Sequence, residues 1–173
     1  MIISASRRTD IPSYYSEWLV NRLKEKYVLV RNPMNIHQVS KIDLSPDVVD
    51  AIVFWTKNPT PMLPYLEQIK DYTYYFQFTL SAYGPDVERN LPSKNKIIIP
   101  TFQQLSKEIG KEKVIWRYDP IFFNVQYSME YHCKYFEVLA SKLGDYTEKC
   151  TVSFMDMYRN TERNVRTLSI VKD

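Results

Sequence analysis

Four short apolar runs in this chain each end in charged or amide residues. The runs and the segments that follow them are IISAS with RRTD at 7–10, YVLV with RNP at 31–33, AIVFW with TKNP at 56–59, and VIW with RYDP at 117–120. Arginine suits carboxylate or phosphate recognition because its planar guanidinium makes paired hydrogen bonds. Several guanidinium groups around one cavity repel each other unless an anion lies between them. The pattern therefore predicts a site for an anionic or nucleotide-like ligand.

The candidate residues combine cations, carboxylates, neutral hydrogen-bonding groups and one ring for stacking. They are Arg7, Arg8, Asp10, Arg31, Asn32, Trp55, Lys57, Asn58, Gln77, Thr79, Arg117, Asp119 and Asp156. The alternative is that the charges pair among themselves, with Arg7 or Arg8 on Asp10 and Arg117 on Asp119. The Asn-Pro and Asp-Pro steps also fit simple turns, because proline disfavours a helical conformation at the residue before it.

The elements that must position these residues alternate between strand-like and helix-like segments. Strands are predicted at about 2–5, 27–30, 51–55, 73–80, 114–117 and 150–154, with a small extended piece at 38–42. Helices are predicted near 12–23, 60–69, 100–109, 128–143 and 161–169, with one helical turn at 48–50. Strands separated by helices need crossover connections, which make the sheet mostly parallel. Ligands bind at the carboxyl ends of such strands, so the polar segments should share one rim.

The segment 74–81 helps to choose between two parallel folds. Tyr75, Gln77, Thr79 and Ser81 alternate with a set of apolar and aromatic residues, so one side of this strand is polar. A central strand of a doubly wound sheet would be apolar on both sides. We therefore predict an α/β fold with a mostly parallel sheet, as a partial (β/α) TIM-like barrel of about six strands. Residues 1–173 are assigned to one domain.

The histidines, cysteines and tyrosines give further expectations. His132 lies on the apolar stripe of the helix 128–143 and is predicted to be a core histidine, whereas His37 is better placed for acid–base chemistry. Cys133 and Cys150 show neither a disulfide pattern nor metal-ligand spacing, so no metal site is predicted. Fourteen tyrosines indicate many partly buried rings whose hydroxyl groups reach polar partners.

Composition and charge set broad limits on partners and location. A formal net charge of +3 and a pI near 8.7 permit nucleic acid as a partner without indicating it. The sequence shows no apolar run long enough to span a membrane, and its amino terminus lacks signal-peptide order, so we expect a cytoplasmic protein that does not bind membranes. An interrupted barrel leaves its first and last strands unpaired, which favours self-association.

Six blocks of this sequence, in order, resemble a widespread prokaryotic family of unknown function. The blocks are ISASRRTDIP, VLVRNPMN, IVFWTKNP, YYFQFTLSAYG, VIWRYDPI and EKCTVSF. The resemblance covers nearly the whole chain and implies a partial (β/α) barrel. Longer members carry, near the carboxyl end, a cysteine cluster like that of radical S-adenosylmethionine enzymes. Some are described as similar to DNA repair photolyases or spore photoproduct lyase.

The resemblance implies S-adenosylmethionine and a 4Fe-4S cluster as cofactors of the longer relatives, with residues at the strand ends holding the adenosyl ligand or the substrate. Such a cluster needs three closely spaced cysteines, and this chain has two, 17 positions apart. We therefore expect the N-terminal, ligand-binding portion of a radical S-adenosylmethionine-like protein, and its enzymatic status stays open. One alternative is a non-enzymatic nucleic-acid or nucleotide-binding domain. A second alternative is a hydrolase that uses Asp10, Asp119 and Asp156.

Overall fold

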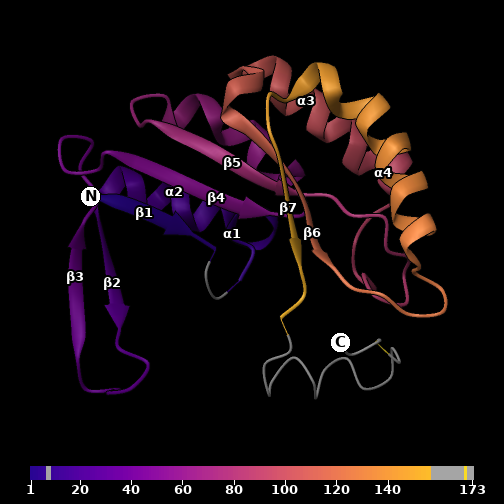
Figure 1. Ribbon diagram of the computed structural model, residues 1–173. Coiled ribbons are helices and arrows are strands. Elements are labelled where there is room, and N and C mark those ends of the chain that lie inside the picture. The colour runs from indigo at the N-terminus through magenta and orange to yellow at the C-terminus, as the bar shows by residue number, and fades with distance from the viewer. Residues whose placement is uncertain (7–8, 157–169, 171–173) are drawn as a thin grey trace. The chain divides into compact units, whose positions relative to one another are not determined.

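A computed structural model describes residues 1–6, 9–156 and 170 of the chain (Figure 1). The fold is α/β, with a five-stranded parallel sheet in the order β1-β4-β5-β6-β7 and a separate two-stranded sheet, β2-β3. The strands are β1 (Ile2–Ala5), β2 (Tyr27–Arg31), β3 (Val39–Asp43), β4 (Ala51–Thr56), β5 (Tyr74–Thr79), β6 (Val114–Ile121) and β7 (Cys150–Phe154). The chain divides into two compact units, residues 1–76 (unit 1) and 77–173 (unit 2).

Helices of three kinds connect the strands. The α-helices are α1 (Ile11–Tyr14), α2 (Ser16–Glu25), α3 (Ile99–Ile109) and α4 (Met129–Leu143). The 3-10 helices are η1 (Thr60–Ile69), η3 (Lys111–Lys113) and η4 (Gly144–Tyr146), and η2 (Lys94–Ile98) is a π-helical turn before α3. In the described part of the chain, none of these helices has the length and apolar character that crossing a membrane requires.

Unit 1 is built on the parallel pair β1 and β4, whose register runs from Ile2 opposite Ala51 to Ala5 opposite Phe54. Helices α1, α2 and η1 contact one another and close the apolar core of this unit. The buried residues of α2, β4 and η1 that form it are Leu19, Val20, Leu23, Ile52, Phe54, Met62, Leu66 and Ile69. The segment 60–69 is a 3-10 helix with Pro64 inside it, and proline removes the hydrogen bond that an α-helix needs there.

The second predicted strand does not join the parallel sheet. β2 pairs antiparallel with β3, from Tyr27 opposite Asp43 to Arg31 opposite Val39, and the two form a hairpin. The physical reason is the short connection, because the loop 32–38 is too short for the crossover that parallel pairing requires. The extended piece predicted at 38–42 is β3. The helical turn predicted at 48–50 is a hydrogen-bonded turn, in which Val48 N and Val49 N donate to Ser45 O.

Unit 2 contains the end of β5 together with β6 and β7, which pair in parallel with Arg117 opposite Thr151. Helices α3 and α4 cover one side of these strands: the Phe78 ring lies 5.0 Å from that of Phe102 on α3, and Trp116 stacks on Phe136 of α4 at 4.9 Å. Phe78 and Trp116 are buried, as a helix-covered side requires.

The parallel α/β prediction is confirmed, and five of the six predicted parallel strands lie in one sheet. The alternation predicted for β5 is confirmed by burial, since Phe76 and Phe78 are buried while Tyr75, Gln77 and Thr79 are half-buried. Closure of the sheet as a partial barrel and the assignment to one domain stay predictions. The helix predicted at 161–169 lies outside the described residues.

Candidate functional site

Asp10 joins the loop after β1 to the loop after β4 in unit 1. Its Oδ1 accepts a hydrogen bond from Ser13 N at 3.0 Å, which caps α1. Its Oδ2 accepts from Thr56 Oγ1 at 3.0 Å and from Lys57 N at 2.8 Å. Ser13 Oγ donates in turn to Asn58 O at 2.8 Å. Within the described part of the chain its hydrogen-bond donors are neutral, and they fix two loops that follow neighbouring strands.

Three further candidates, Trp55, Lys57 and Asn58, lie next to Thr56 in the sequence of unit 1. Asn58 has the turn role, because its Oδ1 accepts from both Thr60 N (3.2 Å) and Thr60 Oγ1 (2.6 Å) at the start of η1. Lys57 is half-buried, and Trp55 is 38% exposed between two buried neighbours of β4. Trp55 thus presents a ring at the surface of unit 1.

Arg117 and Asp119 form an ion pair on β6 in unit 2, as the alternative interpretation of the sequence proposed. Arg117 Nη2 and Nε both donate to the Asp119 carboxylate, which makes the contact bidentate. The side chains are mostly buried, at 18% and 11% exposure. Arg117 Nη1 also donates to Gln77 Oε1 at 3.4 Å, and Ser153 Oγ donates to Asp119 Oδ2 at 3.3 Å. Asp119 and Pro120 lie within β6, joined by a cis peptide bond, and do not form a turn.

The ion pair belongs to a larger polar surface, which we call the polar face of unit 2. It lies on the side of β5, β6 and β7 opposite the rings that pack against α3 and α4, and consists of Gln77, Thr79, Arg117, Asp119, Thr151 and Ser153. Gln77, Thr79 and Thr151 are half-buried and Ser153 is exposed. Ser81 is 1% exposed, and its Oγ has no hydrogen-bond partner among the described residues.

The remaining candidates are placed elsewhere or lie outside the description. Arg31 is exposed at the end of β2, and Asn32 Nδ2 donates to Gln38 Oε1 at 2.7 Å in the hairpin loop. Because β2 lies outside the parallel sheet, the prediction that these two residues share its rim is wrong. Asp156 is exposed after β7, and Arg7 and Arg8 lie outside the described residues.

His132 of α4 is a core histidine, as predicted. It is 5% exposed; its Nε2 lies 3.1 Å from Phe122 O, and its Nδ1 lies 2.9 Å from Tyr118 Oη. A carbonyl can only accept, so Nε2 carries the proton and the Tyr118 hydroxyl donates to Nδ1. Burial lowers the pKa of His132 and raises the pKa of Tyr118, since it disfavours both charged forms. This histidine is neutral and structural.

A cluster that the sequence did not single out orders the loops after β5 and β6 in unit 2. Lys94 Nζ donates to Ser81 O (2.7 Å) and Tyr83 O (2.5 Å) and pairs with Glu88 Oε2 (2.5 Å). Tyr83 Oη accepts from Phe122 N at 2.9 Å and donates to Pro120 O at 2.8 Å. The tyrosine content indicated that such hydroxyl partners exist but not which backbone groups they are.

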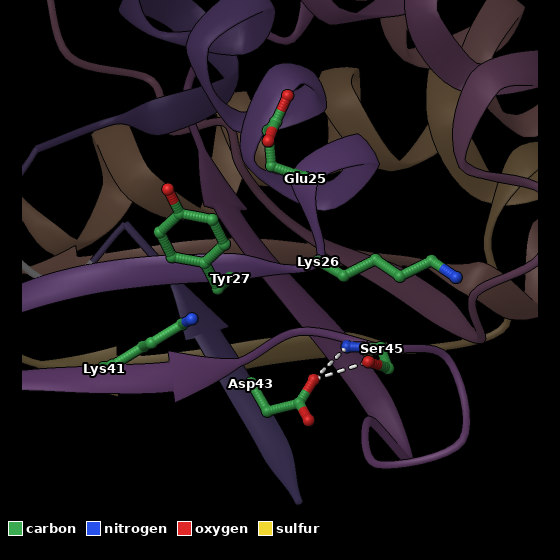
Figure 2. Close-up of a pocket in the computed structure, with 6 residues that line it drawn as sticks. All are labelled: Glu25, Lys26, Tyr27, Lys41, Asp43 and Ser45. Atoms are coloured by element: carbon green, nitrogen blue, oxygen red, sulfur yellow. Dashed lines mark hydrogen bonds between the residues drawn. The ribbon is translucent and has the colours of Figure 1, made fainter.

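A pocket of about 350 Å³ lies between the end of α2 and the base of the hairpin in unit 1. Figure 2 shows its lining residues, Glu25, Lys26, Tyr27, Lys41, Asp43 and Ser45. Lys41 Nζ lies 4.4 Å from the centroid of the Tyr27 ring, a cation–π contact. Asp43 Oδ1 accepts from Ser45 Oγ (2.5 Å) and Ser45 N (2.8 Å), and these two bonds lower the pKa of Asp43.

Comparison with known proteins places the chain in a family. The model of the domain of unknown function DUF1848 matches residues 2–172. The chain belongs to the DUF1848 family. No curated protein and no solved structure matches it. The match supports the part of the sequence resemblance that concerns an uncharacterised family, and it says nothing of a relation to radical S-adenosylmethionine enzymes.

The described residues of this DUF1848 chain do not fit a 4Fe-4S cluster. Cys133 is exposed on α4, and burial raises the pKa of Cys150 to about 11, which disfavours the thiolate that binds metal. The described part of the chain also holds no group of three or more His, Cys, Asp or Glu side chains arranged to bind a metal ion. We therefore assign no step of chemistry to such a cluster here.

Proposed function

We propose that this DUF1848 chain is a ligand-binding portion of a radical S-adenosylmethionine-like protein, and that it binds a nucleotide-like small molecule on the polar face of unit 2. One observation carries the proposal. Both sides of a parallel sheet are normally apolar because helices cover them. Here the side that faces α3 and α4 is apolar, while the opposite side of β5, β6 and β7 carries amide, hydroxyl and charged groups.

The chemistry of the polar face indicates the class of ligand. Arg117 and Asp119 present a guanidinium and a carboxylate next to each other, which complements a ligand with both a carboxylate and an ammonium group. Gln77, Thr79 and Ser153 add neutral groups that suit ribose hydroxyls. Ser81 follows the end of β5, and its buried Oγ has no hydrogen-bond partner among the described residues. A buried polar atom is normally satisfied, which supports a ligand bound near the end of β5. S-adenosylmethionine carries a carboxylate, an ammonium group and ribose hydroxyls.

Isothermal titration with S-adenosylhomocysteine, the unreactive analogue, tests the proposal. We expect saturable binding by the wild-type chain and about tenfold weaker binding by Gln77→Met, because a ligand hydrogen bond worth roughly 1.4 kcal/mol is lost. Gln77→Met keeps the length of the side chain and leaves the ion pair of Arg117 and Asp119 in place. The matched control is Gln104→Met on the exposed side of α3, which should bind like the wild type. Absence of binding by the wild type, or equal affinity of the two variants, would refute the proposal.

A further inference from the structure

The hairpin of β2 and β3 presents apolar side chains to solvent. Met34 is 92% exposed, Ile36 64% and Leu29 61%. Figure 1 shows the two strands projecting side by side from the rest of unit 1 and ending in the loop 32–38. A two-stranded hairpin is marginally stable in water, and exposed apolar residues on one indicate a surface that binds a partner.

The hairpin and the end of α2 that leads into it carry an excess of positive charge equal to the net charge of the whole chain. Residues 22–43 contain five Lys or Arg against two Asp or Glu, which gives a net charge of +3. The whole chain has the same formal net charge of +3, so the remaining residues are neutral on balance. A positive region this localised is complementary to a polyanion.

The strand register gathers cations and apolar groups on one side of the hairpin. Leu29 lies opposite Lys41, and Arg31 lies opposite Val39, so these four side chains share one side. At the base of the hairpin, the Arg22 guanidinium carbon lies 5.8 Å from the centroid of the Tyr27 ring. Strands of five residues span about 17 Å, which is enough to reach several successive phosphates of a duplex.

The loop at the tip of the hairpin is shaped by its own amide side chains. Asn32 Oδ1 accepts from Met34 N at 2.9 Å, and Asn35 Oδ1 accepts from His37 N at 3.2 Å. Asn32 Nδ2 also donates to Gln38 Oε1, across the loop. These bonds fix the backbone that presents Met34 and Ile36, so little conformational entropy remains to be lost when the tip binds.

We propose that this hairpin binds double-stranded DNA, with Arg31 and Lys41 on backbone phosphates and Met34 or Ile36 inserted at a base step from the minor groove. Proteins that bend DNA insert apolar wedges of this kind, Met and Ile among them, while cations hold the flanking phosphates. The side-chain NH2 groups of Asn35 and Gln38, which the loop bonds above do not use, can donate to base edges, whereas the hydrocarbon region of a bilayer would offer them no acceptor. The observations therefore favour a duplex over a membrane surface.

The inference is independent of the proposed ligand site. The hairpin belongs to unit 1 and the polar face to unit 2, so each can be altered alone. Gln77→Met should leave DNA binding unchanged, and variants of the hairpin should leave S-adenosylhomocysteine binding unchanged. If one proposal fails, the experiment on the other still gives an independent result.

Fluorescence anisotropy of a labelled 20-base-pair duplex, measured over a range of salt concentrations, tests the cationic contacts. We expect the double variant Arg31→Gln, Lys41→Gln to bind at least about tenfold more weakly at low salt and to reduce the slope of log K against log salt by about two. The matched control is Lys96→Gln, Lys107→Gln, which removes the same charge from exposed positions of unit 2 and should stay within twofold of the wild type. A wild type that does not bind, or equal losses in both double variants, would overturn the proposal.

The apolar wedge has a separate test. We expect Met34→Ser, Ile36→Ser to weaken duplex binding by about tenfold at an unchanged salt slope and to abolish DNA bending measured by resonance energy transfer between the duplex ends. Both residues are exposed, so the unfolding temperature should not fall. Two results contradict the wedge: sedimentation with phosphatidylserine vesicles without duplex binding, or binding of single-stranded DNA as tight as that of the duplex and insensitive to this variant.

Discussion

Asp10 and Asp119 are both carboxylates that the sequence places at or after the end of a parallel strand, yet the protein satisfies them in different ways. Asp10 accepts hydrogen bonds from two backbone N–H groups and a threonine hydroxyl in unit 1. Asp119 is paired with the Arg117 guanidinium in unit 2 and receives one further bond from Ser153. The first carboxylate joins loops, and the second neutralises a cation within the sheet.

The difference shows which carboxylate suits a ligand site. Donors fixed in the backbone hold Asp10 whatever else binds, because they serve the cap of α1 and the connection after β4. The partners of Asp119 are side chains on a polar face, and side chains can exchange a protein partner for a ligand. The comparison therefore supports the polar face of unit 2, rather than the Asp10 network, as the proposed ligand site.

The largest effect is expected from breaking the ion pair. Arg117→Ala should lower the free energy of unfolding by about 3 kcal/mol, because it leaves a mostly buried carboxylate without its charged partner. Urea denaturation measures this change. Arg117→Met combined with Asp119→Leu should recover most of the loss, and Arg89→Ala, at an exposed position, should have little effect. A small loss in Arg117→Ala would mean that Asp119 is well solvated.

Removing the other carboxylate should have a smaller effect. Asp10→Ala should lower the free energy of unfolding by about 2 kcal/mol, since it deletes a helix cap and two bonds to the loop after β4. Hydrogen exchange of the segments 10–15 and 55–60 should increase together in this variant. Faster exchange in only one segment would show that Asp10 does not couple the two loops.

Acid pH should lower the stability of the protein through His132 in unit 2. Because burial lowers the pKa of His132, the unfolded chain takes up a proton near pH 6.5 while the folded chain does so only at lower pH. This contribution to stability is therefore complete above pH 6.5 and is lost as the pH falls below it. Urea denaturation at several pH values should show this slope in the wild type but not in His132→Gln. An unchanged slope in His132→Gln would contradict the assignment.

The smallest effects come from two serines that support the two carboxylate networks. Ser13→Ala removes a 2.8 Å bond to Asn58 O and should cost about 1 kcal/mol. Ser153→Ala removes a 3.3 Å bond from an exposed residue and should cost less than about 0.5 kcal/mol. Thermal unfolding of the two variants measured side by side gives the ranking. A larger loss for Ser153→Ala would show that the exposed end of the polar face is more rigid than its burial indicates.

Local patterns predicted much of the fold. The alternation along β5 predicted which residues are buried, and the apolar stripe of α4 predicted a core position for His132. Both follow from side-chain periods of two and 3.6 residues, which depend on nearby sequence alone. The same reasoning failed for β2, because an apolar run of four residues fits a parallel strand and a hairpin strand equally well. The short connection to β3 was the available signal.

Parts of the candidate site depended on contacts that local sequence does not specify. The pairing of Arg117 with Asp119 was one of two interpretations, and two residues of spacing along a strand made it plausible without deciding it. The anchor of Lys94 on Ser81 O and Tyr83 O was missed, because backbone carbonyls have no sequence signature. The bonds of Asp10 to Thr56 and Lys57 span 46 and 47 positions and depend on the pairing of β1 with β4.

The sequence by itself determined that this protein is a parallel α/β protein, which sides of its strands and helices are apolar, and where its charges fall along the chain. Those properties are set by side-chain chemistry and by short-range periodicity. Only the tertiary structure decided which strands share a sheet, which carboxylate neutralises Arg117, and that Arg31 belongs to a projecting hairpin. Those outcomes depend on register and loop closure, where segments far apart compete for the same hydrogen bonds and charges.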